Sequence, residues 1–77
     1  MHDPSEYLAL ANRHVVESDE RIAAQRERVE RQRQAGHDVR HSQELLRVLL
    51  EGHKLLVAHQ KELEREMAEW RTLHPEH

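Results

Sequence analysis

The sequence predicts an all-α protein, an antiparallel two-helix hairpin with coiled-coil-like packing that is expected to dimerise into a four-helix bundle. Ala, Leu, Glu, Gln and Arg, all good helix formers, dominate its 77 residues. Only two Gly and two Pro are present, too few turn-forming residues for a many-stranded β protein. Apolar residues recur every seven positions in both halves of the chain, the spacing of an apolar seam between packed helices.

The first helix is predicted over about residues 4–35. Asp3 is placed as an N-cap, Pro4 occupies the first helical position, where its missing N–H costs nothing, and Glu6 closes a capping box. No further Gly or Pro interrupts the chain before Gly36. One seam position holds Leu8, Val15, Ile22 and Val29, and the other holds Ala11, Ser18, Gln25 and Gln32.

A turn over residues 36–38 is predicted to join this helix to a second one over about residues 39–73. Gly36 suits the left-handed conformation that ends a helix, and Asp38 is able to cap the next one. His74 precedes a proline, a position that disfavours helical geometry, so the second helix is expected to end before it. A connection this short makes the helices antiparallel. One continuous helix through Gly36, or disorder caused by the high charge, are the alternatives.

The seam of the second helix mixes apolar and polar residues. Polar residues at seam positions usually cost stability and set the register of the packed helices. His53 is either hydrogen-bonded to Ser18 or to a water across the seam, or responds to pH, because unperturbed imidazole titrates at about pH 6.5. The two seam rows are Leu49, Leu56, Leu63 and Trp70, and Leu46, His53, Gln60 and Met67.

The apolar face of the second helix is wider than one neighbouring helix covers. At about 100° per residue, the apolar residues between positions 45 and 57 span an arc of roughly 220°. The uncovered part of the arc would be an exposed apolar patch of the kind that marks a protein interface, so we expect self-association. The predicted dimer interface comprises Leu45, Leu46, Val48, Leu49, Gly52, His53, Leu55, Leu56 and Val57.

The distribution of charge predicts how two copies meet. Residues 21–54, the closed end of the hairpin, carry eight Arg or Lys against five Asp or Glu, a net charge of +3. The open end, residues 1–20 and 55–77, carries four against ten, a net charge of −6. If two second helices cross antiparallel near Gly52, each acidic end lies beside the basic tip of the partner. Alternatively, Gly52 is a tolerated helix glycine. The charged residues concerned are Glu64, Glu66 and Glu69 at the open end, and Arg26, Arg28, Arg31 and Arg33 at the tip, where they are candidates to face a partner protein.

Eight histidines raise the question of a metal site, but we expect no bound metal and no cofactor. The hairpin would bring His14 and His59 to one level, and His37 and His41 have the spacing of two ligands on one helix face. The Glu-x-x-His pair of di-iron bundles is absent, and two ligands without a third make a poor site. These four histidines are therefore named as candidate metal ligands, although no metal site is expected.

Several function classes are not expected. The sequence has no Gly-rich phosphate loop, and no Ser or Thr stands beside a His and an acid in a recognisable nucleophile motif, so we expect no enzyme. The Arg-rich segment 21–33 is interleaved with Glu27 and Glu30, and the net charge is −3, unlike a nucleic-acid-binding surface. No apolar run approaches the roughly 20 residues of a membrane span. The acidic first residues and the absence of Cys favour a cytoplasmic location.

A family resemblance is carried by five segments, namely Arg13-His14-Val15, Ile22-Ala23, Gln25-Arg26-Glu27, Gly36-His37-Asp38 and Leu45-Leu46. They resemble short uncharacterised helical-hairpin proteins of rhizobia and related alphaproteobacteria. The resemblance covers about residues 10–65. It implies a bacterial cytoplasmic helical hairpin, and it brings no known activity, substrate or catalytic residue.

These observations predict a non-enzymatic, small homodimeric helical-bundle protein with an adaptor or regulatory role in protein–protein interaction. The expected partners are a second copy of the chain and another protein, with no membrane and no nucleic acid. A metal- or pH-responsive bundle that uses the histidines, and a nucleic-acid accessory protein, are the alternatives.

Overall fold

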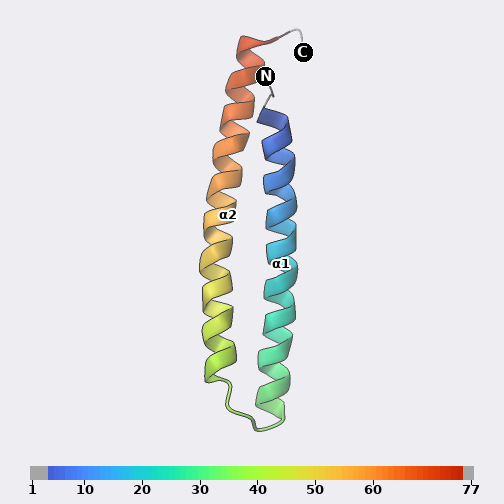
Figure 1. Cartoon of the computed structure of the whole chain (residues 1–77), viewed down its shortest axis with the longest axis vertical. Helices are drawn as coiled ribbons and strands as arrows, with labels where there is room; N and C mark the ends of the chain where they lie inside the picture. The colour runs from blue at the N-terminus through green and yellow to red at the C-terminus, as the bar shows by residue number, and fades with distance from the viewer. Residues whose placement is uncertain (1–3, 76–77) are drawn as a thin grey trace.

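Two long α-helices joined by a tight turn make up the computed structural model, which describes residues 4–75 (Figure 1). Helix α1 runs over Pro4–Gln34 and helix α2 over Arg40–Leu73. The two helices lie side by side and antiparallel in a rod of 60 × 16 × 14 Å, with the turn at one end. The predicted all-α helical hairpin is confirmed.

The outer ends of both helices fall where they were predicted. α1 begins at Pro4, and the predicted N-cap, Asp3, lies outside the described residues. α2 ends at Leu73. His74 donates its backbone N–H to the carbonyl of Trp70 at 2.9 Å and stacks its ring on the indole, with ring centroids 4.2 Å apart. The chain therefore leaves the helix with its last carbonyls partly satisfied.

The turn is built on Gly36. Its φ of 75° is in the left-handed region that glycine adopts without steric cost. The N–H of His37 donates to the carbonyl of Gln32 at 2.9 Å, and the N–H of Gly36 donates to that of Arg33 at 3.0 Å. These two bonds are the Schellman motif that commonly ends a helix at a glycine. α1 consequently stops at Gln34, one residue earlier than predicted.

The start of α2 differs slightly from the prediction. The helix begins at Arg40, and Val39 occupies the N-cap position without a side-chain hydrogen bond. Asp38 instead accepts the N–H of Arg40 at 3.0 Å and pairs with its guanidinium at 2.7 Å. The hydrogen bonds from the side chain and the N–H of Arg40 hold the pKa of Asp38 below its ordinary value of 3.8. Asp38 thus satisfies a free N–H of the first turn from one position further out than a standard cap.

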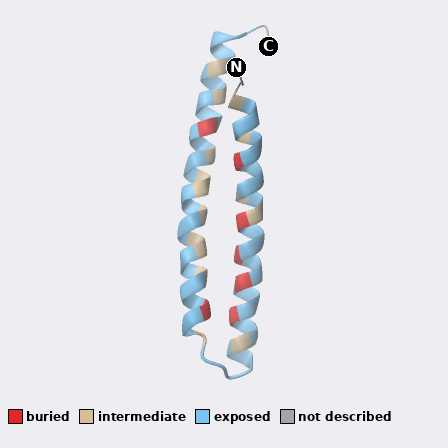
Figure 2. Ribbon diagram, in the orientation of Figure 1, coloured by how far each residue is buried: buried red, intermediate tan, exposed pale blue. Residues whose placement is uncertain are grey.

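The core is a single thin seam between the helices. The buried residues lie on the sides of α1 and α2 that face each other (Figure 2). Among residues 4–75 no large side chain is completely buried. The buried residues are Ala11, Ile22, Val29 and Leu63 among the apolar side chains, and Ser18, Gln25 and Ser42 among the polar ones.

Candidate self-association surface

Polar residues in the seam and beside it form hydrogen bonds between the two helices. The amide of Gln60 donates to Asn12 Oδ1 at 2.7 Å, and the amide of Gln25 donates to the backbone carbonyl of Ser42 at 2.9 Å. The Ser42 hydroxyl in turn donates to Gln32 Oε1. Within residues 4–75, every fully buried side-chain nitrogen or oxygen has a partner. Because a shift in register would break these pairs, the polar seam favours the observed alignment.

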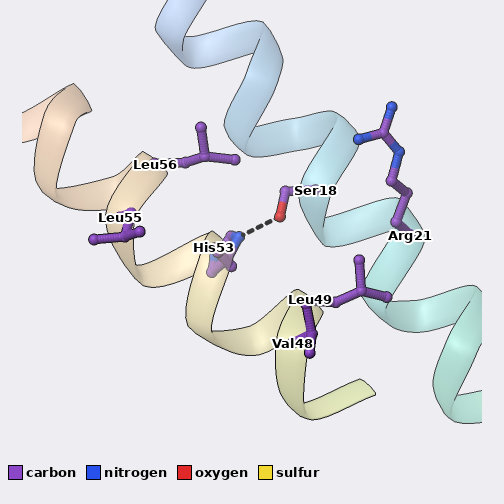
Figure 3. Close-up of a pocket in the computed structure, with 8 residues that line it drawn as sticks. Ser18, Arg21, Val48, Leu49, His53, Leu55 and Leu56 are labelled. Atoms are coloured by element: carbon purple, nitrogen blue, oxygen red, sulfur yellow. Dashed lines mark hydrogen bonds between the residues drawn. The ribbon is translucent and has the colours of Figure 1, made fainter. Parts of the chain in front are cut away.

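His53 makes the central polar contact of the hairpin. Its Nδ1 lies 3.0 Å from the Ser18 hydroxyl (Figure 3). Its Nε2 lies 3.3 Å from Asp19 Oδ1. Of the alternatives that the sequence left open for His53, the structure shows the direct contact with Ser18. The contact with Asp19 was not predicted, although Asp19 follows Ser18 directly in the sequence.

A hydroxyl, an imidazole and a carboxylate thus meet at one place, an arrangement that no sequence motif indicated. In hydrolases such a trio works with backbone N–H donors that stabilise an oxyanion. Ser18 is only 7% exposed and lies in the middle of α1, where backbone N–H groups are bonded to helix carbonyls. The chemistry that this geometry supports is therefore a hydrogen-bonded link between the two helices.

This link yields a stability prediction. Replacing Ser18 by Ala is expected to lower the free energy of unfolding by about 1 kcal/mol, because the imidazole of His53 loses its hydroxyl partner. In a His53→Leu background, the same Ser18→Ala replacement is expected to cost clearly less. Urea unfolding of the four proteins of this double-mutant cycle measures the difference. Equal costs of Ser18→Ala in both backgrounds would contradict the link.

An open groove runs along one side of α2 next to this link. It has a volume of about 440 Å³. Besides Ser18 and His53 of the link, it is lined by Arg21 from α1 and by Val48, Leu49, Gly52, Leu55 and Leu56 from α2. In Figure 3, Leu49 and Leu56 extend toward α1, whereas Leu55 points away from it. Some apolar residues of the groove therefore pack into the seam, and others face the solvent.

The predicted interface residues divide into two groups in the structure. Five of them, Leu46, Leu49, His53, Leu56 and Val57, are half-buried within the single hairpin. The others are exposed, and we call them the α2 stripe: Leu45, Val48, Gly52 and Leu55. The apolar members of the stripe are 39, 50 and 74% exposed for Leu45, Val48 and Leu55. The surface that remains for a partner is therefore narrower than the predicted arc, because seam side chains are already partly covered by α1.

Basic side chains are available near the turn. Arg26, Arg28 and Arg31 are exposed and have no acidic side chain within ion-pair distance in the described part of the chain. Arg33, by contrast, pairs with Glu30 on its own helix at 3.1 Å. Three of the four predicted partner-facing arginines are thus free to interact elsewhere.

Acidic side chains are available near the other end of the rod. Glu64 and Glu66 have no basic side chain within ion-pair distance among residues 4–75. Arg65 pairs with Glu62 and, at 2.9 Å, with Glu69. The hydrogen bond to Glu62, together with both negative charges, raises the pKa of Arg65. This end of α2 keeps a net negative charge.

The candidate metal-binding histidines all lie on the exposed surface. His14 and His59 are exposed on α1 and α2, His37 lies in the turn, and His41 lies in the first turn of α2. Nowhere between residues 4 and 75 do three His, Asp or Glu side chains come close enough together to hold a metal ion. Over the same residues, neither helix combines the length and apolar character needed to cross a membrane.

Comparisons with known proteins found no relative of this chain. No protein-family model matches the sequence, and neither the curated proteins nor the solved structures give a match. The resemblance to short rhizobial proteins stays a prediction. Only the hairpin itself therefore indicates a function.

Proposed function

We propose that this chain is a non-enzymatic interaction protein that works as a homodimer, with the α2 stripe of each copy buried against the other in a four-helix bundle. One contrast carries the proposal. In residues 4–75 only four apolar residues are buried, whereas Leu45, Val48 and Leu55 stay 39, 50 and 74% exposed. So few buried and so many exposed apolar residues are expected of a chain whose hydrophobic core is completed by a second copy.

The size of the chain supports the same view. A domain of this length buries only about 60% of the surface that its unfolded chain exposes. There is no Cys to form a stabilising disulfide. Full burial of a Leu or Val side chain stabilises by about 1.5–3 kcal/mol, and a two-fold interface makes every contact twice. Association therefore supplies the apolar burial that a single hairpin lacks.

The available surface is also large enough. The broad face of the rod measures 60 × 16 Å. Stable protein interfaces cover about 800 Å² on each partner, so most of one face would be used. The charged outer faces of the resulting bundle would remain free to bind another protein, as an adaptor or regulator does. The metal- or pH-responsive bundle and the nucleic-acid accessory protein stay predictions.

Sedimentation equilibrium and thermal unfolding over a range of concentrations test the proposal. We expect a mass of twice 9.2 kDa at micromolar concentration, and a melting temperature that rises with protein concentration. A mass of 9.2 kDa together with sharp, concentration-independent unfolding at high temperature would contradict it.

A further inference from the structure

One broad face of the hairpin changes in character along its length. On α2, the stripe continues past Leu55 at the same spacing of three and four residues, through His59 to Glu62, Glu66 and Glu69. The face is therefore apolar near the middle of the rod and acidic toward the end of α2.

The α1 side of the same face is basic toward the turn. Arg21 lines the groove together with Val48 and Leu55, so it lies on this face. Arg28 follows seven residues later, about two helical turns along the same side, and Arg31 lies one further turn on. The two ends of the face thus carry opposite charges.

We propose that a second copy of the chain binds this face in antiparallel orientation, about a two-fold axis at Gly52. This inference rests on the proposed function and adds the orientation of the two copies and the position of the two-fold axis. Residue i of α2 then lies opposite residue 104−i of the partner's α2, because residue 52 is its own counterpart. No side-chain or other neighbouring atom lies within 4 Å of the place where a Cβ of Gly52 would be, so two backbones are able to approach closely there.

Charge complementarity selects the antiparallel orientation. The central hydrogen bonds between α1 and α2 join residues whose numbers add to 71 and 72. Arg28 and Arg31 are therefore level with about residues 40–43 of α2, which antiparallel pairing sets opposite about residues 61–64 of the partner. That segment holds two Glu and one Lys, and Glu66, which has no ion-pair partner among residues 4–75, follows it on the same face. A parallel arrangement would instead place arginines over arginines and glutamates over glutamates.

The two kinds of interaction have different roles in this dimer. Exposed ion pairs add little affinity and are screened by salt, so the charges choose between orientations. Burial of the α2 stripe supplies the affinity, because apolar contacts are the main favourable term in association.

Cysteine cross-linking tests the orientation directly, because the chain has no Cys of its own. Positions 45 and 59 add to 104, so antiparallel pairing sets Leu45 of one copy opposite His59 of the other. We expect an equimolar mixture of the Leu45→Cys and His59→Cys variants to form a mixed disulfide at least about tenfold faster than either variant alone, since pairing raises the effective thiol concentration. Intact mass spectrometry separates mixed from self-linked products.

Lys54→Cys is the matched control, because this exposed position is turned away from the stripe on the same helix. Preferential self-linking of Leu45→Cys would show a parallel dimer and overturn the inference, while the dimeric mass would keep the proposed function. Mixed linking no faster than that of Lys54→Cys, in a protein of dimeric mass, would place the interface on another face; it would overturn the inference and, in the proposed function, the burial of the α2 stripe, and would leave only the homodimer. A mass of 9.2 kDa at micromolar concentration would overturn both the inference and the proposed homodimer.

Discussion

Replacing Leu55 by Glu is expected to convert the dimer into a monomer. Leu55 is 74% exposed in the single hairpin and points away from α1, so the substitution removes little from the hairpin itself. In the antiparallel dimer, position 55 lies opposite Leu49 of the partner, so a carboxylate there would lose its water among apolar side chains. Burying a charge in an apolar interface costs on the order of 4 kcal/mol, so the dissociation constant should rise about 1,000-fold. Sedimentation equilibrium at micromolar concentration measures this change.

Val16→Glu is the control for this prediction. Val16 is also an exposed apolar residue, at 55%, but it lies about 140° around α1 from Arg21, away from the groove. Its replacement should leave the dimeric mass unchanged. If Leu55→Glu and Val16→Glu gave the same mass and the same concentration dependence of melting, the α2 stripe would not be the interface.

The hairpin could be predicted from the sequence because its determinants are local. Gly36 adopts the left-handed conformation that a helix end needs, and Pro4 starts α1 where a missing N–H has no cost. The differences amount to one residue at Gln34 and one at Arg40. They arise because the Schellman bonds and the Asp38 contact shift the cap positions, and these depend on backbone geometry in the turn.

The site could be predicted only in part, because partners across the seam depend on register and on side-chain reach. Ser18 and His53 both occupy seam positions, so their pairing follows from the heptads. Asn12 and Asp19 lie beside the seam, seven residues apart, and reach across it to α2. Periodicity does not reveal such contacts from flanking positions.

The sequence could not predict how much of the apolar face of α2 is left uncovered by α1, for a related reason. An arc on a helical wheel counts apolar residues but does not show how far the neighbouring helix covers each one. In the structure, Leu49 and Leu56 reach toward α1, whereas Leu45 and Leu55 stay exposed. The predicted interface therefore narrows to the α2 stripe, and this narrowing makes single substitutions informative.

Replacing Ile22 by Ala is expected to lower the stability of the folded protein strongly. Ile22 is 7% exposed in the seam, and large-to-small substitutions of buried Ile cost about 2–4 kcal/mol through lost transfer energy and an unfilled cavity. A two-fold dimer contains the defect twice, so the midpoint of urea unfolding should fall strongly. Val16→Ala removes a β-branched side chain from an exposed position of the same helix, where the change should stay within about 0.5 kcal/mol.

The comparison of these two variants tests whether the seam holds the protein together. If α1 and α2 of one chain pack as in the hairpin, Ile22→Ala weakens folding while the α2 stripe, which lies beside the seam, keeps the side chains of the dimer interface. Dimer dissociation, measured under conditions where the variant is still helical, should then change far less than in Leu55→Glu. If Ile22→Ala lowered the free energy of unfolding no more than Val16→Ala, Ile22 would not lie in the core. One continuous helix, without the turn at Gly36, would then explain the chain better than the hairpin.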